Sequence, residues 1–218
     1  MYQTSFFICV WYNSDVNKKE NKENNLKTVV LASNNNHKLK EFKEILKDYE
    51  ILSLKDIGFN DEIDETGSTF EENAIIKAKT IHEYLKNQNK DYIVIADDSG
   101  LCVNSLNGEP GVYSSRYAGE HGNEVKNRAK LLKELEGKDR TAYFECTIVV
   151  YYPNEEYKVF VGKTYGKITE EELGSKEFGY DCIFMSDDLN KTFGEATEEE
   201  KNAVSHRGRA IEEMLKEI

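Results

Sequence analysis

The stretch from Ala142 to Val150 restricts the possible folds more than any other part of the sequence. Apolar residues recur there at every second position, and Tyr143, Glu145 and Thr147 alternate with them. This two-residue period matches a β-strand with one buried face. Pro153 and Asn154 then favour a turn, and Tyr157–Val161 is a second strand-like segment. The sequence therefore predicts an antiparallel hairpin.

The other segments alternate between strand-like and helical patterns. Thr28–Ser33 and Tyr92–Ala96 are strand-like, and the second of these is expected to end at the pair Asp97 and Asp98. A hairpin among strand–helix units predicts an α/β fold with a mixed sheet and flanking helices. Four expected helices carry apolar residues at helical spacing: Leu39, Phe42 and Leu46; Phe70, Ala74, Ala78, Ile81 and Leu85; Val125, Ala129, Leu132 and Leu135; Ile211, Met214, Leu215 and Ile218.

The composition excludes several classes of partner. The 218 residues carry a formal net charge of -12, which repels nucleic acid and anionic membrane surfaces unless basic residues are concentrated in one place. A polyanionic small ligand would therefore need a local cationic site or a metal. The four cysteines lie far apart without a C-x-x-C pair, which argues against a zinc site or a disulfide framework and favours a cytoplasmic protein.

The N-terminal segment, residues 1–27, differs from the rest of the chain. Asn13–Lys27 is polar and without periodicity, so we expect a flexible extension, with the folded domain covering residues 28–218. The apolar run Phe6–Tyr12 lacks the flanking pattern of a targeting peptide and is too short to span a bilayer.

The turn after the first strand is a candidate phosphate site. It consists of Ser33, Asn34, Asn35, Asn36, His37 and Lys38, placed between a strand and a helix. Unpaired backbone N–H groups and the helix dipole attract phosphate at such a position, and Lys38 adds a cation. The alternative is a polar turn followed by a surface Lys38 that pairs with Glu41. The motif alone leaves both interpretations open.

Asp97 and Asp98 are the strongest candidates for metal chemistry. Neighbouring side chains point in different directions, so one carboxylate can bind a metal while the other anchors the loop. Mg2+ takes oxygen ligands and suits one or two carboxylates together with substrate phosphates. Glu65 is a candidate second ligand, whereas Glu72 fits a capping box with Thr69. The alternative is a solvated turn in which Asp97 caps backbone N–H groups.

A third group of residues suits a nucleotide base. Phe178 offers a stacking face, and Lys201 and Arg207 supply fixed positive charge. His206 and Arg207 are hydrogen-bond donors when charged, and would favour a 6-oxo purine over adenine by roughly 1–3 kcal/mol for each good contact. Alternatively, Ser205 caps the last helix and the two following side chains are solvated.

Six blocks of the sequence, in order, resemble the inosine/xanthosine triphosphate pyrophosphatase family. They are Ser33-x-Asn35-x-x-Lys38-x-x-Glu41, Glu65–Ala74, Ala96–Leu101, Gly111–Gly119, Phe178–Asp181 and Glu200–Gly208. The resemblance implies an elongated mixed sheet, two lobes with the nucleotide in the cleft between them, a homodimer, and Mg2+-dependent hydrolysis of non-standard purine triphosphates such as ITP, dITP and XTP.

The resemblance also implies roles for individual residues. Asp98 would be the general base and a Mg2+ contact, with Glu65 as the second metal contact. Phosphates and sugar would be held by Ser33, Asn34, Asn35, Asn36, His37, Lys38 and Ser99. The base and the triphosphate would be held by Phe178, Gly179, Tyr180, Asp181, Lys201, His206 and Arg207.

Two residues depart from the family pattern. Asn34 stands where such sequences often have Gly, and asparagine tolerates a left-handed backbone better than most residues. Cys182 follows Asp181 where Pro is usual, which is expected to loosen the loop that places Asp181.

The sequence leaves two alternatives to the expected activity. One is a pyrophosphatase for ordinary or pyrimidine nucleoside triphosphates, and the other is a nucleotide-binding sensor that does not cut its ligand. In the expected reaction, Asp98 activates the water that attacks the α-phosphorus, while Mg2+ and Lys38 neutralise the pyrophosphate leaving group.

Overall fold

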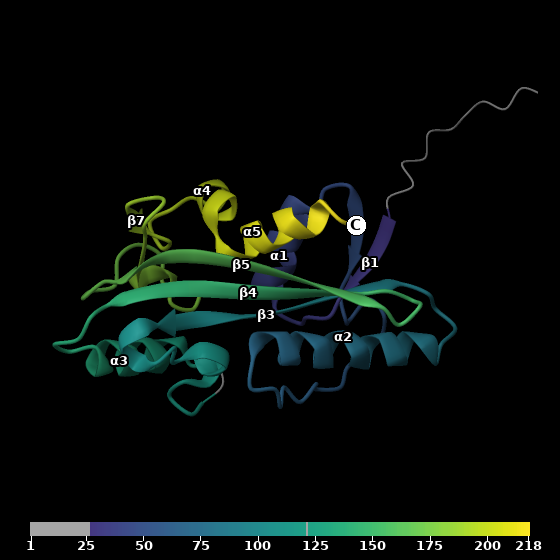
Figure 1. Ribbon diagram of the computed structural model, residues 1–218, viewed down its shortest axis with the longest axis horizontal. Coiled ribbons are helices and arrows are strands. Elements are labelled where there is room, and N and C mark those ends of the chain that lie inside the picture. Colours follow the sequence, from purple (N-terminus) through teal and green to yellow (C-terminus); the bar gives the residue numbers. More distant parts are fainter. Residues whose placement is uncertain (1–26, 121) are drawn as a thin grey trace, which may run out of the picture.

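A computed structural model of the chain describes residues 27–120 and 122–218. The predicted N-terminal extension, except for Lys27, lies outside the described residues, as does the apolar run Phe6–Tyr12. The described chain forms a seven-stranded sheet in the order β2-β1-β3-β4-β5-β6-β7, with helices on both faces (Figure 1). The strands are β1 Lys27–Leu31, β2 Tyr49–Leu52, β3 Ile93–Val103, β4 Thr141–Tyr151, β5 Tyr157–Ile168, β6 Phe184–Ser186 and β7 Lys191–Thr192.

The sheet is mixed, as predicted. Strand β1 pairs in parallel with both β2 and β3, whereas β3, β4, β5, β6 and β7 pair antiparallel in succession. The predicted hairpin is the β4–β5 pair, and β5 continues beyond the expected Val161 to Ile168. The α/β class, the mixed sheet and the flanking helices are therefore confirmed.

Strand β3 corrects one prediction about the pair Asp97 and Asp98. The strand does not end at these residues but continues to Val103, because β4 supplies antiparallel partners along this whole length. The parallel partner β1 ends at Leu31, opposite Ile95. Asp97 and Asp98 therefore lie in mid-strand, just beyond the point where β1 leaves one edge of β3 without a neighbouring strand.

Helices cover the two faces of the sheet differently. Figure 1 shows α1 (Asn36–Ile45), α4 (Glu198–Val204) and α5 (His206–Leu215) on one side, with α2 (Phe70–Lys86) and α3 (Glu124–Glu134) on the other. One buried cluster joins α1 and α5 to the sheet, and a second joins α2 to the opposite face. A third cluster packs α3 against the far ends of the long strands. The three short 3-10 helices are η1 Asn104–Leu106, η2 Gly111–Arg116 and η3 Asp181–Ile183.

The apolar stripe predicted for α3 is wrong at its start. Val125 is 66% exposed and Ala129 is exposed too, whereas Asn127 and Arg128 face the interior with Leu131. These two polar side chains can be buried because their polar groups hydrogen-bond to neighbouring loops. In α5, Leu215 is likewise exposed, while Ala210, Ile211 and Met214 are buried. None of the helices within residues 27–120 and 122–218 combines the length and the apolar character needed to cross a bilayer.

Candidate active site

The turn between β1 and α1 has the expected strand–turn–helix form. Asn35 is the N-cap of α1, and its Oδ1 accepts hydrogen bonds from the backbone N–H groups of His37 at 2.9 Å and Lys38 at 3.2 Å. The Oγ of Ser33 accepts from the backbone N–H of Asn35. The backbone φ of Asn34 is not positive, so this turn does not need the left-handed conformation that glycine would favour.

Lys38 reaches across to β3 and pairs with Asp97. Its Nζ lies 3.0 Å from Asp97 Oδ2, and the Asp97 side chain is fully buried. The alternatives of a surface Lys38–Glu41 pair and a solvated Asp97 are therefore both wrong. Burial would raise the pKa of Asp97, but Lys38 and Arg207 hold that pKa well below its usual range. Within the part of the chain that the structure describes, Asp97 Oδ1 is buried without a hydrogen-bond partner.

Arg207 is buried at the start of α5 and joins three acceptors. Its guanidinium lies 3.3 Å from Asp97 Oδ2, donates to Ser99 Oγ at 3.0 Å, and forms an ion pair with Glu41. Ser205 does cap the helix, because its Oγ accepts from the N–H of Gly208, but the expectation that the following side chains are solvated is wrong. A buried arginine is tolerated in the first turn of this helix because the carboxylates of Asp97 and Glu41 balance its charge.

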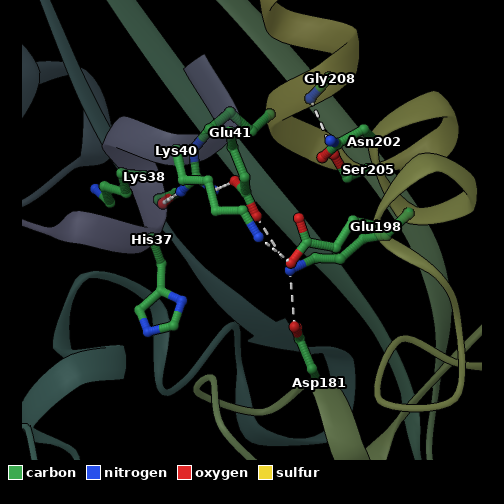
Figure 2. A network of polar contacts seen from close by, with 12 residues as sticks. His37, Lys38, Lys40, Glu41, Asp181, Glu198, Asn202, Ser205 and Gly208 are labelled. Carbon is green, nitrogen blue, oxygen red and sulfur yellow. Dashed lines mark hydrogen bonds and ion pairs between the residues drawn. The ribbon is translucent and has the colours of Figure 1, made fainter. Parts of the chain in front are cut away.

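Glu41 on α1 and Asp181 on the opposite loop both contact Lys201. Lys201 Nζ lies 3.1 Å from Glu41 Oε1 and 2.7 Å from Asp181 Oδ2. Figure 2 shows the carboxylates of Glu41 and Asp181 pointing towards each other from two sides, with the Lys201 ammonium between them. Burial would raise the pKa of Glu41, but Arg207 and Lys201 lower it to about 2. Burial raises the pKa of Asp181 despite the neighbouring Lys201.

Two further contacts join α1 to α4 at the rim of this cluster. Lys40 Nζ lies 2.6 Å from Glu198 Oε1 (Figure 2). Asn202 Nδ2 donates to Glu44 Oε2 at 3.0 Å. The two helices are therefore held together by exposed as well as buried polar contacts.

Phe178 is half-buried and lies beside the charged cluster. Lys201 Nζ is 4.9 Å from the centre of its ring, and the His37 ring is 5.0 Å away at a 41° tilt. The loop is closed by a hydrogen bond from the N–H of Asp181 to the Phe178 carbonyl, and Gly179 has a φ of +49°. Cys182 is fully buried, and its carbonyl accepts from the Leu173 N–H at 2.7 Å, so a backbone contact holds the chain beside Asp181.

His206 is buried and stacks on Phe144, with ring centres 4.8 Å apart. Burial and the nearby Arg207 lower the pKa of His206 well below its ordinary value. The imidazole is therefore neutral at pH 7 and offers one donor and one acceptor, rather than the two donors of the charged form that the sequence suggested. Its Nδ1 has no hydrogen-bond partner among residues 27–120 and 122–218.

The opposite face of β3 carries Asp98, which points towards α2. Asn73 Nδ2 donates to Asp98 Oδ2 at 3.0 Å, and the N–H of Ser99 donates to Asp98 Oδ1. Lys77 Nζ lies 3.6 Å from Asp98 Oδ1 and 3.2 Å from Glu65 Oε1. Burial raises the pKa of Asp98, and Lys77 and Lys38 oppose this only in part.

The residues around Asp98 fit a divalent cation whose coordination shell is completed by a bound ligand. Glu65 and Asp98 both contact the Lys77 ammonium, so the fold gathers two carboxylates around one positive charge. The described residues include no group of three or more His, Cys, Asp or Glu side chains that could hold a metal by themselves. Two carboxylate ligands are what Mg2+ uses where substrate phosphates complete its shell.

Asn73, Lys77 and Glu41 were not predicted as site residues from the sequence. Asn73 Oδ1 also accepts from the Gly67 N–H at 2.8 Å, so one amide joins the Glu65 loop to Asp98. Asn73 and Lys77 are four residues apart, on the side of α2 that also buries Ala74 and Ala78. Polar residues at these positions within a buried stripe were the available signal. Thr69 is the N-cap of α2 as predicted, and its Oγ1 accepts from the Glu72 N–H at 3.1 Å. The Glu72 carboxylate in turn accepts from the Ser68 N–H.

Two hollows of about 380 and 350 Å³ open on the described surface, and neither is lined by a predicted site residue. Ion pairs instead join α1, α4, α5 and Asp181 within the charged cluster. The nucleotide cleft implied by the resemblance stays a prediction.

Comparison with known proteins identifies the family. The model of the Ham1 family matches residues 29–217, almost the whole described chain. The chain belongs to the Ham1 family. Among Ham1 relatives, a dITP/XTP pyrophosphatase of Clostridium perfringens is 52% identical over 195 residues, which cover 87% of this chain and 96% of the relative. The dITP/XTP pyrophosphatase of Bacillus subtilis is 48% identical over 196 residues, covering 88% and 96%.

Solved Ham1 structures have the same fold. The Staphylococcus aureus Ham1 protein superposes with a TM-score of 0.77 at 43% identity, covering 87% of this chain and 97% of that protein. A Ham1 protein of Coxiella burnetii superposes with a TM-score of 0.76 at 40% identity, covering 88% and 100%. The family resemblance and the fold class stated from the sequence are confirmed.

Proposed function

We propose that this protein is a nucleoside triphosphate pyrophosphatase that hydrolyses non-standard purine nucleoside triphosphates to the monophosphate and pyrophosphate. The names of the Ham1 relatives, which include dITP/XTP pyrophosphatases at 45–52% identity, support the substrate class. The structural observation that carries the proposal is the different environment of the two neighbouring aspartates on β3. Asp97 is neutralised by Lys38 and Arg207, while Asp98 keeps a raised pKa beside Glu65.

Asp98 is the proposed general base. A carboxylate whose pKa is raised takes a proton more readily at neutral pH than an ordinary aspartate. Asp98 takes a proton from water, the water oxygen forms a bond to the α-phosphorus, and the bond from that phosphorus to the bridging oxygen breaks. Pyrophosphate leaves with the electrons of the broken bond. Lys38 and Lys77 are the nearest cations to Asp97 and Asp98, and they offset the negative charge of the phosphates.

Mg2+ is the proposed cofactor, held by Glu65 and Asp98 together with the substrate phosphates. Bound there, it would supply a further positive charge against the triphosphate. Asn73 joins Asp98 to the loop that carries Glu65, because its amide contacts both Asp98 and the Gly67 N–H. The turn Ser33–Lys38 and Ser99 are the proposed phosphate and sugar contacts.

The proposed base site lies between α1 and the loop of residues 178–181. Phe178 supplies the stacking face, and Lys201 and Asp181 supply polar groups at its edge. His206 contributes as a neutral imidazole, and Arg207 through a guanidinium already bonded to Asp97 and Glu41. Gly179 and Tyr180 complete this loop. We also propose a cytoplasmic homodimer without nucleic-acid or membrane partners, on the basis of resemblance and acidic charge.

A substrate panel tests the proposed function. ITP, XTP, dITP, GTP, ATP and UTP are incubated with the protein with and without Mg2+, and the products are identified as pyrophosphate or phosphate. We expect pyrophosphate release from the first three nucleotides, and only when the metal is present. Equal rates across the panel would support the pyrophosphatase of ordinary or pyrimidine nucleotides. Binding of ITP without pyrophosphate release would support the sensor.

A further inference from the structure

Arg128 on α3 is a buried charge that the mechanism above does not use. Its side chain is 2% exposed. The Nε donates to Glu172 Oε1 at 2.7 Å, and one terminal nitrogen donates to the backbone carbonyl of Gly179 at 2.8 Å. Removing an arginine from water is costly unless its donors are satisfied, so this contact fixes the loop relative to α3.

The bonded carbonyl is next to the proposed base-stacking residue. Gly179 follows Phe178 directly and precedes Asp181 by two positions. Among the described residues, Arg128 is the one group outside the loop that hydrogen-bonds to Phe178 or Gly179. Other backbone bonds hold the later part of the loop, since the Gly194 N–H donates to the Asp181 carbonyl. The position of the Phe178 end therefore depends on Arg128.

The neighbouring residue of α3 holds the surface on which the loop rests. Asn127 Nδ2 donates to the Ser115 carbonyl at 3.1 Å, and its Oδ1 accepts from the Ala118 N–H at 2.7 Å. Tyr180 Oη donates to the Ser114 carbonyl at 2.8 Å. Two consecutive residues of α3 thus fix both the loop and the segment on which it is seated.

We propose that Arg128 is a positioning residue for recognition of the base. By bonding the Gly179 carbonyl, it holds the Phe178 ring beside His37 and Lys201, where a purine is to stack. The inference rests on the proposed function, because it assigns the base to this loop. It predicts that Arg128 affects binding of the base and not binding of the pyrophosphate part, which the Ser33–Lys38 turn and Lys77 would contact.

Separate ligands for the two halves of the substrate test the proposal. Calorimetry measures the binding of IMP and of inorganic pyrophosphate, each with Mg2+, to the wild type and to Arg128→Lys. A lysine cannot span Glu172 and the Gly179 carbonyl together, so the loss of one charge-assisted bond is expected to weaken IMP roughly tenfold. Pyrophosphate affinity is expected to change less than about twofold, since its contacts are untouched. In turnover of ITP, KM rises while kcat stays near the wild-type value.

Arg140→Lys is the matched control. Arg140 also donates to backbone carbonyls, those of Ile168 and Thr169 at 2.9 Å, but at the end of β5 rather than beside Phe178. This variant is expected to leave the ratio of IMP to pyrophosphate affinity unchanged. The positioning role would be overturned if Arg128→Lys also left the ratio of IMP to pyrophosphate affinity unchanged, whether neither ligand or both ligands bind more weakly.

A milder variant keeps the test decisive if Arg128→Lys does not fold. Glu172→Gln removes the ion pair but leaves the arginine and the Gly179 carbonyl in place, and IMP binding is expected to weaken about two- to threefold with pyrophosphate unchanged. Weakening of pyrophosphate binding as much as of IMP binding in this variant would overturn the proposal. The proposed function fails separately, if the wild type leaves ITP intact.

Discussion

Asp97 and Asp98 are neighbours in the sequence, yet the fold places them in opposite electrostatic surroundings. Asp97 faces α1 and α5, where it joins Glu41 and Asp181 in contacts with Lys38, Lys201 and Arg207. Asp98 faces α2, where Lys77 is shared with Glu65. The alternation of side chains along a strand is sufficient to separate them.

The pairing of charges differs between the two sides, and so do the pKa shifts of the two aspartates. Three cations meet three carboxylates on the Asp97 side, and the pKa of Asp97 is lowered. One lysine meets two carboxylates on the Asp98 side, and burial raises the pKa of Asp98. The first side is neutral without a ligand and stabilises the fold. The second keeps a negative surplus that suits a divalent cation and a proton-accepting carboxylate.

The largest effect is expected when the Asp98 side is altered. Asp98→Asn removes the proposed base while keeping the shape and the bond from Ser99, so turnover of ITP should fall by on the order of 10² to 10⁴. The free energy of unfolding should stay close to that of the wild type, because burial already disfavours the charged form. Turnover measured beside a urea unfolding curve separates the two quantities. Near wild-type turnover would remove Asp98 from this role.

The next effect concerns stability and comes from the Asp97 side. Arg207→Met leaves Glu41 buried without its main cation and Asp97 with Lys38 alone, so the free energy of unfolding should fall by about 3–5 kcal/mol. Arg209→Met is the control on the same helix. Arg209 is about a third exposed and pairs with Asp188, so its loss should cost about 1 kcal/mol or less. Equal losses in urea unfolding would contradict the difference between the buried and the exposed arginine.

The sequence predicted the elements of the fold well because their hydrophobic periods are strong. The β4–β5 hairpin and the α2 stripe follow directly from local spacing. The predicted end of β3 was wrong because the pattern of apolar residues stops at Ala96. The length of the strand is instead determined by its hydrogen bonds to β4. The buried face predicted for the start of α3 was wrong because Asn127 and Arg128 are buried there by contacts with loops distant in the sequence. Local patterns do not report such partners.

The motifs in the sequence named candidate site residues but did not give their arrangement in space. The residues on both sides of β3 were named from motifs, but the pairing of Lys38 with Asp97 and the bridging of Glu65 and Asp98 by Lys77 depend on three-dimensional distances. Lys77 was missed because a lysine in a helix is usually solvated, and only its position on the buried side of α2 marks it as unusual.

The smallest effect tests the balanced side through pH. The pKa of Glu41 is lowered from its ordinary 4.5 to about 2, so Glu41 stabilises the fold fully above pH 4.5 and loses that contribution as the pH falls towards 2. Glu41→Gln should therefore reduce the free energy of unfolding by about 3 kcal/mol at pH 7, but by only about 1 kcal/mol at pH 3. Urea unfolding of both proteins across this range measures the gap. A gap that does not change with pH would show that the Glu41 charge, and with it the balance of cations and carboxylates around Arg207, does not stabilise the fold. In that case the contrast between the two faces of β3 would lie in the negative surplus around Asp98 alone.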